Sequence, residues 1–260
     1  MKKFWVVGAV AMLSLALAAI AYAQIERTNS YTAEGSVSPT KKGTATKPVP
    51  VGINFNYSVG EASGNRPVPV EKYSIRFAGL RQNSNRFPGC SAAKINANQG
   101  SEKCKGSLLG KGKITAVAGP ATDPTNKSGN CPLNVEIHNA KQNKAAIYVV
   151  GGPNAPAGKG TTCPLATNAA LPANFVKRGN AMALEFSVPK EPFRFYQGFE
   201  VSVINVQSKL ARRTTKYRGK TVGYFEVAGK GCVSGRRAIT VNFTDQEGGT
   251  GAAAGTTTCK

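Results

Sequence analysis

Few side chains in this sequence have the types and the spacing that catalysis requires. His138 is the only histidine, and its alternation with Asn134 and Glu136 puts it on the polar face of a strand, where we expect an exposed surface residue. The carboxylates are scattered, and Glu136 with Glu185 is the pair that we consider for a glycosidase-like site. No serine stands in a Gly-x-Ser-x-Gly setting, so the nucleophile elbow of α/β hydrolases is absent. These residues favour a protein that is not an enzyme, with a secreted hydrolase as the alternative.

A second candidate is the run of residues 149–163, VVGGPNAPAGKGTTC, which resembles the phosphate loop of nucleoside monophosphate kinases. Two extra residues separate Gly152 from Gly158, whereas the phosphate cradle depends on a fixed run of backbone N–H groups. Pro164 follows where that loop needs a helix, and residues 106–113, GSLLGKGK, fit the pattern less well. We therefore predict no nucleotide site.

No metal ion or other cofactor is predicted. One histidine, together with six cysteines that we expect in disulfides, leaves no zinc ligand set. Residues 123–130, DPTNKSGN, offer oxygen ligands, but only one carboxylate stands among them, beside a lysine. That composition is unlike a calcium loop.

The strongest binding candidate is a basic segment, residues 209–220, around a predicted tight turn. Its six positive side chains are Lys209, Arg212, Arg213, Lys216, Arg218 and Lys220. Spread over a hairpin tip, such groups can hold the phosphates or carboxylates of a polymer. The alternative is a solvated hairpin whose charges discourage pairing between sheet edges.

The charge balance also points to anionic partners. The chain has 34 basic and 13 acidic residues; without residues 1–23 it keeps 32 basic and 13 acidic residues, a net charge of +19. A strongly positive electrostatic field favours binding of cell-wall polymers, lipopolysaccharide, anionic lipid or nucleic acid. The sequence contains no dedicated nucleic-acid motif. Non-specific association is the simpler explanation of the same charge.

Residues 1–23 are predicted to be a secretory signal peptide. Two lysines precede an uncharged apolar stretch, and the triplet AYA at 21–23 is a small-x-small cleavage site. An uncleaved membrane anchor is the alternative. After cleavage we expect no membrane span and a secreted or cell-surface protein.

Six cysteines, all after residue 23, indicate three disulfides in an exported chain. Six cysteines allow 15 pairings, and the simplest pairing follows their order along the chain: Cys90–Cys104, Cys131–Cys163 and Cys232–Cys259. The first pair is close in sequence and closes a short loop.

Strand patterns extend over the rest of the chain. Val51, Ile53, Phe55, Tyr57 and Val59 alternate with polar residues, as do Tyr73, Ile75 and Phe77, and we expect these two strands to pair. We count ten to twelve strands and no long helical period. The predicted fold is an all-β, disulfide-stabilised antiparallel β-sandwich, immunoglobulin-like or related.

The predicted organisation has three parts after the signal peptide. Residues 24–47 form a polar, basic N-terminal segment with a possible edge strand. Residues 48–244 form the β-sandwich domain, with a possible small subdomain in the last third. Residues 245–260 are rich in glycine, alanine and threonine and are predicted to be a flexible tail.

The stretch around the first cysteine pair carries a resemblance. Residues 87–94, FPGCSAAK, and 104–112, CKGSLLGKG, are similar to a pattern in uncharacterised exported proteins of high-GC Gram-positive bacteria. The likeness extends over residues 31–244. It implies export, a bridged β-fold and an envelope or extracellular location. It implies no activity, so no functional residues are transferred.

The sequence thus predicts a secreted or cell-surface β-protein that is not an enzyme and binds anionic envelope polymers through its basic hairpin. A hydrolase with a carboxylate pair and a purely structural exported protein without a ligand are the two alternatives.

Overall fold

The computed structural model of the protein describes residues 26–151 and 162–260. The predicted signal peptide, and most of the loop that we compared with a phosphate loop, lie outside these residues.

Antiparallel strands make up most of the fold. Those of the first half are β1 (Asn29–Ser38), β2 (Val49–Glu61), β3 (Val70–Ala78), β4 (Leu80–Gln82), β5 (Leu108–Pro120), β6 (Gly129–Lys141) and β7 (Lys144–Gly151). Those of the second half are β8 (Thr167–Arg178), β9 (Ala181–Ser187), β10 (Phe195–Tyr196), β11 (Phe199–Leu210), β12 (Thr214–Tyr217), β13 (Lys220–Gly223), β14 (Phe225–Val227), β15 (Cys232–Val233), β16 (Arg236–Asp245) and β17 (Thr250–Thr258). The helical segments are α1 (Ala92–Ala97) and the short segments η1 (Ser84–Arg86), η2 (Glu102–Ser107) and η3 (Lys190–Arg194).

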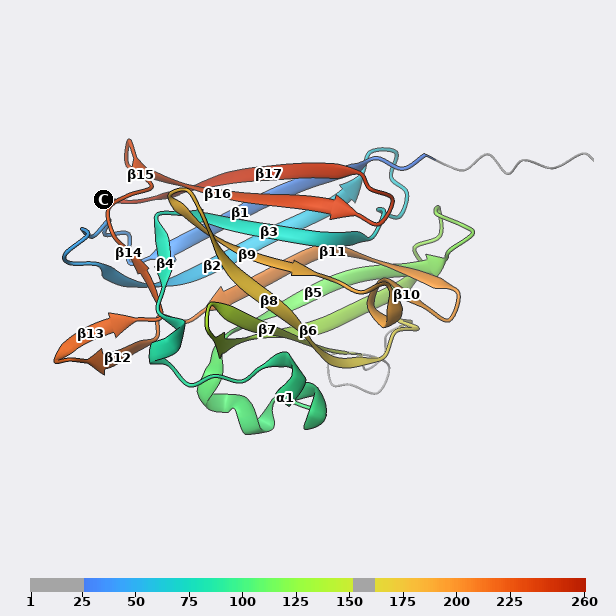
Figure 1. The fold of residues 1–260 in the computed structure, drawn as a ribbon. Coiled ribbons are helices and arrows are strands. Elements are labelled where there is room, and N and C mark those ends of the chain that lie inside the picture. The colour runs from blue at the N-terminus through green and yellow to red at the C-terminus, as the bar shows by residue number, and fades with distance from the viewer. Residues whose placement is uncertain (1–25, 152–161) are drawn as a thin grey trace, which may run out of the picture.

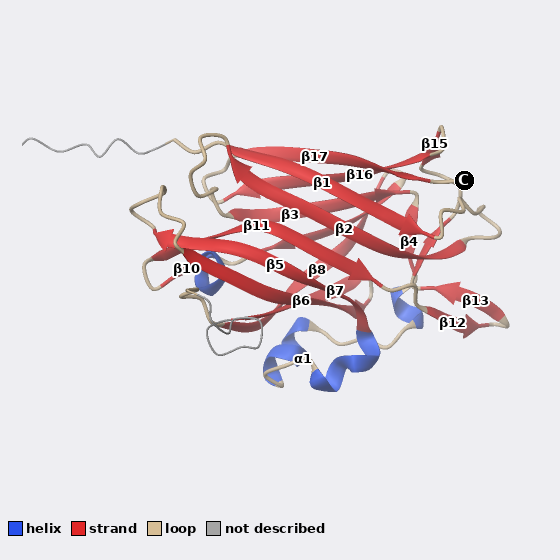
Figure 2. Ribbon diagram, turned by 180° about the vertical axis from the view of Figure 1, so that it is seen from behind, coloured by secondary structure: helices blue, strands red, loops and turns tan. Residues whose placement is uncertain are grey.

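All strands except the β12–β13 hairpin belong to one continuous sheet. Its order is β15-β16-β3-β9-β8-β7-β6-β5-β11-β2-β14-β4, with β1 on β2, β10 on β11 and β17 on β16. The sheet curls strongly into a half-barrel, so that β16, β3, β9 and β8 form one wall (Figure 1) and β1, β2, β11 and β5 form the other (Figure 2). The all-β antiparallel prediction is confirmed.

The prediction of a two-sheet sandwich is wrong. Hydrogen-bonded ladders run without interruption from β5 through β6, β7 and β8 to β9, and so they connect the two walls. The expected pairing of β2 with β3 is wrong for the same reason, because β3 pairs with β16 and β9 instead. Alternation shows that one face of a strand is buried, but a curled sheet and a sandwich both bury one face of each strand.

The core lies inside the curl. The inward residues of β2 and β3 predicted from alternation are buried and meet across it, as where the rings of Phe55 and Phe77 lie 5.7 Å apart. The curl depends on glycine on the inner face of β5. A Cβ on Gly112 would lie 2.2 Å from the carbonyl oxygen of Gln207 on β11, and a Cβ on Gly110 would lie equally close to that of Lys209. Only glycine lets the two strands approach this closely.

The ends of the chain complete the sheet. Residues 245–260, expected to be a flexible tail, contain β17, which pairs with β16 along its whole length. β1 pairs with β2 and lies beside β17, where the backbone N–H of Val37 donates to Thr257 Oγ1 at 3.4 Å. Glycine and alanine, which fill the middle of this strand, carry no strong strand signal, so the strand depends on its partners.

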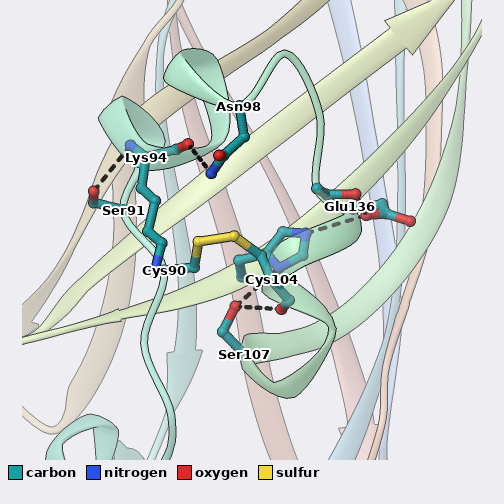
Figure 3. The surroundings of a disulfide bond; sticks show 9 residues. Cys90, Ser91, Lys94, Asn98, Cys104, Ser107 and Glu136 are labelled. Carbon is teal, nitrogen blue, oxygen red and sulfur yellow. Dashed lines mark hydrogen bonds and ion pairs between the residues drawn. A yellow bond between two sulfur atoms is a disulfide. The ribbon is translucent and has the colours of Figure 1, made fainter.

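Three disulfides join Cys90 to Cys104, Cys131 to Cys163 and Cys232 to Cys259, the pairing expected from their order. The first closes a loop over the outer face of β7 and β8 that carries α1 (Figure 3). The side chain of Ser91 caps α1 by accepting from the Lys94 N–H at 3.2 Å, as its position predicts. Ile95 is buried against this face of the sheet.

Candidate anion-binding surface

The predicted basic hairpin exists and projects from the sheet at the end of β11 (lower left of Figure 1). β12 and β13 pair from Thr214 opposite Gly223 to Tyr217 opposite Lys220. The two turn residues between them, Arg218 and Gly219, both have positive φ, of 49° and 72°. That is the geometry of a two-residue type I′ turn, which follows the twist of the flanking strands.

The six predicted binding residues of this segment have different environments. Arg213 points back to the sheet, where its guanidinium donates to the carbonyl oxygens of Gly106, at 3.0 Å, and Leu108. This side chain fixes the base of the hairpin and does not belong to a binding surface. Lys216 donates to Thr221 Oγ1 across the hairpin at 2.9 Å.

Near the tip, Tyr217 lies between two arginines. The guanidinium of Arg86 lies 3.5 Å from the ring centroid and that of Arg218 lies 5.3 Å from it. Cation–π contact holds two positive groups close together here. Lys216, Arg218 and Lys220 are exposed, as predicted.

Of the two remaining predicted residues, Arg212 is exposed in the connection between β11 and β12. Lys209 belongs to an open polar groove that sequence analysis missed. The groove, with a volume of about 500 Å³, crosses the outer face of β1, β2, β11 and β5. Polar and charged side chains predominate among its lining residues: Glu34, Ser36, Asn54, Asn56, Lys111, Lys113, Gln207, Ser208 and Lys209. Hereafter these residues are called the outer groove.

Strand register sets the arrangement of the outer groove. Lys209 stands directly opposite Lys111 on one side and opposite Asn54 on the other. In the next row, Gln207 stands opposite Lys113 and Asn56. Like charges directly opposite one another in a sheet repel, and the register brings the two lysines Lys111 and Lys209 together in this way. An anion between the two ammonium groups would relieve this repulsion.

Carboxylates neutralise the groove only in part. Lys111 Nζ forms an ion pair with Glu136 Oε1 at 2.8 Å, and this hydrogen bond raises the pKa of Lys111. Lys113 and Lys209 have no ion pair with any described residue, and Glu34 is the one carboxylate among the described residues that line the groove. The groove therefore keeps a positive excess.

Four other carboxylates are held by basic partners outside the groove. Such ion pairs join Glu71 to Arg194, Glu185 to Arg178, Glu200 to Arg27 and Arg66, and Glu226 to Arg81. They cannot also screen the lysines of the outer groove.

The carboxylates considered for hydrolysis lie far apart. Glu136 is on β6 and Glu185 is on β9, with β7 and β8 between them. Three strand spacings are about 14 Å, whereas the two carboxyl groups of a glycosidase are at most about 9.5 Å apart. This pair lacks the geometry of a glycosidase site.

His138 is buried, and the expectation of an exposed residue is wrong. Its Nδ1 lies 3.1 Å from Ser107 Oγ, and its Nε2 lies 3.1 Å from Glu136 Oε2. Only 1% of its surface is exposed, because η2 and the Cys90–Cys104 disulfide cover this part of β6. Ser107 also donates to the carbonyl oxygen of Cys104 at 2.8 Å (Figure 3).

This chain of a serine, a histidine and a carboxylate has the residue types of a hydrolytic triad. Ser107 is only 3% exposed, however, so no substrate carbonyl reaches its hydroxyl. The network attaches the bridged loop to the sheet. Sequence analysis did not detect it because alternation along β6 cannot show that a distant loop covers the outer face.

Comparison with known proteins gives no match to a family model, to a curated protein or to a solved structure. The resemblance of residues 87–112 to exported Gram-positive proteins therefore stays a prediction.

The three disulfides indicate folding in an oxidising compartment. Within residues 26–151 and 162–260, no helix has the length and apolar character needed to cross a membrane.

Proposed function

We propose that this is an exported protein that is not an enzyme and that binds an anionic polymer of the cell envelope in the outer groove. The observation that carries the proposal is the Lys111–Lys209 pair, two lysines that stand directly opposite one another in the strand register at an open groove. Amide side chains of Asn54, Asn56 and Gln207 surround them and can donate to the hydroxyl or carboxylate oxygens of an extended polymer.

The exposed cations of the hairpin extend this surface. β11 leads from Lys209 directly into the β12–β13 hairpin, which carries Lys216, Arg218 and Lys220. A polymer that occupies the groove can continue along the hairpin, where each additional anionic group exchanges its counterions for a basic side chain. Binding of this kind weakens as the salt concentration rises.

The test is retention of the protein on insoluble purified cell wall over a series of salt concentrations. We compare the wild type with a Lys111→Gln/Lys209→Gln double variant. The control is Lys72→Gln/Lys177→Gln, which removes the same charge from exposed positions on β3 and β8. An ammonium near an anionic surface contributes about 1 kcal/mol, so the groove variant should bind roughly 30-fold more weakly at low salt.

Equal losses of retention in the groove variant and in the control would refute the groove as the binding site. Non-specific charge attraction would then explain the retention. Lack of retention of the wild type at low salt would refute polymer binding itself and favour a purely structural role. A third variant, Arg212→Ser/Lys216→Ser, measures the hairpin separately; unchanged retention would restrict the site to the groove.

A further inference from the structure

The interior of the half-barrel contains a cavity that the proposed function does not use. Its volume is about 100 Å³, and a smaller cavity of about 50 Å³ lies next to it. The two share Phe55, Ile75, Ile137, Leu184 and Ser208 as lining residues, so they are adjacent.

The lining is almost entirely apolar. The larger cavity is bordered by aliphatic and aromatic side chains from both walls, and no charged residue lines it among the described residues. Leu184, Phe186 and Val203 are on the inner face of their strands, and yet they are only partly buried. All three side chains line the larger cavity.

Three lining side chains carry a polar group, those of Tyr57, Tyr73 and Ser208. Burial raises the pKa of both tyrosines. Ser208 Oγ lies 3.5 Å from the carbonyl oxygen of Phe55. The lining therefore offers few of the two to four polar partners that a buried water molecule needs.

We infer that this cavity is a binding site for one small, neutral, apolar molecule, of the size of a single aromatic ring or a short hydrocarbon chain. A dry cavity of about 150 Å³ with leucine, isoleucine and phenylalanine walls binds benzene and xenon, and the larger cavity of this protein, at about 100 Å³, is of similar size and lining. A charged or strongly polar ligand is excluded, because no lining group could replace the water that it would lose.

The cavity and the outer groove lie on opposite faces of β2, β5 and β11, and Phe55 and Ser208 are the described residues that line both. Lys111 and Lys209 do not line the cavity. The Lys111→Gln/Lys209→Gln variant should therefore bind apolar probes as the wild type does.

The test is titration of the whole mature protein with benzene and, separately, with xenon, followed by methyl NMR. We expect saturable shifts confined to methyl groups that line the cavity, such as those of Ile75, Leu184 and Val203. Val203→Phe fills the space and should abolish the shifts. Val117→Phe, on the outer face of β5, is the matched control and should leave them unchanged.

A second variant keeps the inference testable if Val203→Phe does not fold. Leu184→Ala enlarges the cavity and should extend binding to naphthalene, which the wild type should not bind. The inference is overturned if neither probe shifts the lining methyl groups, or if the shifts persist in a folded Val203→Phe variant.

Discussion

The buried carboxylate of Glu200 offers the sharpest test of how this fold is stabilised. Arg27 reaches it with both terminal nitrogens, at 2.5 and 3.3 Å, Arg66 donates to it at 3.2 Å, and Gln246 donates at 2.8 Å. Glu200 is 5% exposed and the Arg66 side chain is fully buried. Arg27 also contacts Glu247, whose side chain is 49% exposed.

Glu200→Gln keeps the shape of the side chain and removes its charge. The guanidinium of Arg66 then keeps only carbonyl partners, those of Asp123, Asn126 and Pro120. Removing one partner of a buried ion pair costs about 3–5 kcal/mol. In a domain of 150–250 residues, each kcal/mol lowers the melting temperature by about 2–4 °C. The expected decrease is therefore roughly 6–20 °C.

Thermal unfolding followed by circular dichroism, together with urea titration, measures this loss. Glu247→Gln is the matched control, because it removes a carboxylate from the same arginine at an exposed position, where an ion pair contributes at most about 1 kcal/mol. Equal melting temperatures for the two variants would refute the argument that burial of the pair decides its contribution.

Two further predictions concern the curl and the pH dependence. Gly112→Ala should lower the free energy of unfolding by about 1–3 kcal/mol, because the new Cβ would lie 2.2 Å from the Gln207 carbonyl oxygen. Gly106→Ala is the control: its Cβ would have no neighbouring atom closer than 3.7 Å, so it should have little effect in the same urea titration. Burial alone would raise the pKa of Glu136, but its hydrogen bonds, led by that from Lys111, hold the pKa below its ordinary value of 4.5. The ionised Glu136 carboxylate therefore stabilises the fold above that pH, and this stabilisation is lost as the pH falls through the folded-state pKa. The difference in unfolding free energy between the wild type and Glu136→Gln should shrink from pH 7 to pH 3. An unchanged difference would contradict this.

Local patterns in the sequence predicted several features correctly. Alternation identified the inward faces of β2 and β3. The basic hairpin was found from its charges and its Arg218–Gly219 turn. In each case the physical cause acts over a few residues, so neighbours in sequence carry the signal.

Features that depend on distant residues were not predicted. Register between β5 and β11 places Lys111 opposite Lys209, 98 residues away along the chain, and no local pattern specifies that register. His138 was expected to be exposed because the loop that buries it comes from another part of the sequence.

The sequence by itself determined an all-β, positively charged chain with six cysteines, because composition and alternation are properties of single strands. Only the tertiary structure decided that these strands form one curled sheet with an apolar cavity inside and a cationic groove outside. The physical reason is that a strand with one apolar face needs a buried surface to pack against, and its own sequence does not specify whether a second sheet or the far wall of the same sheet provides it.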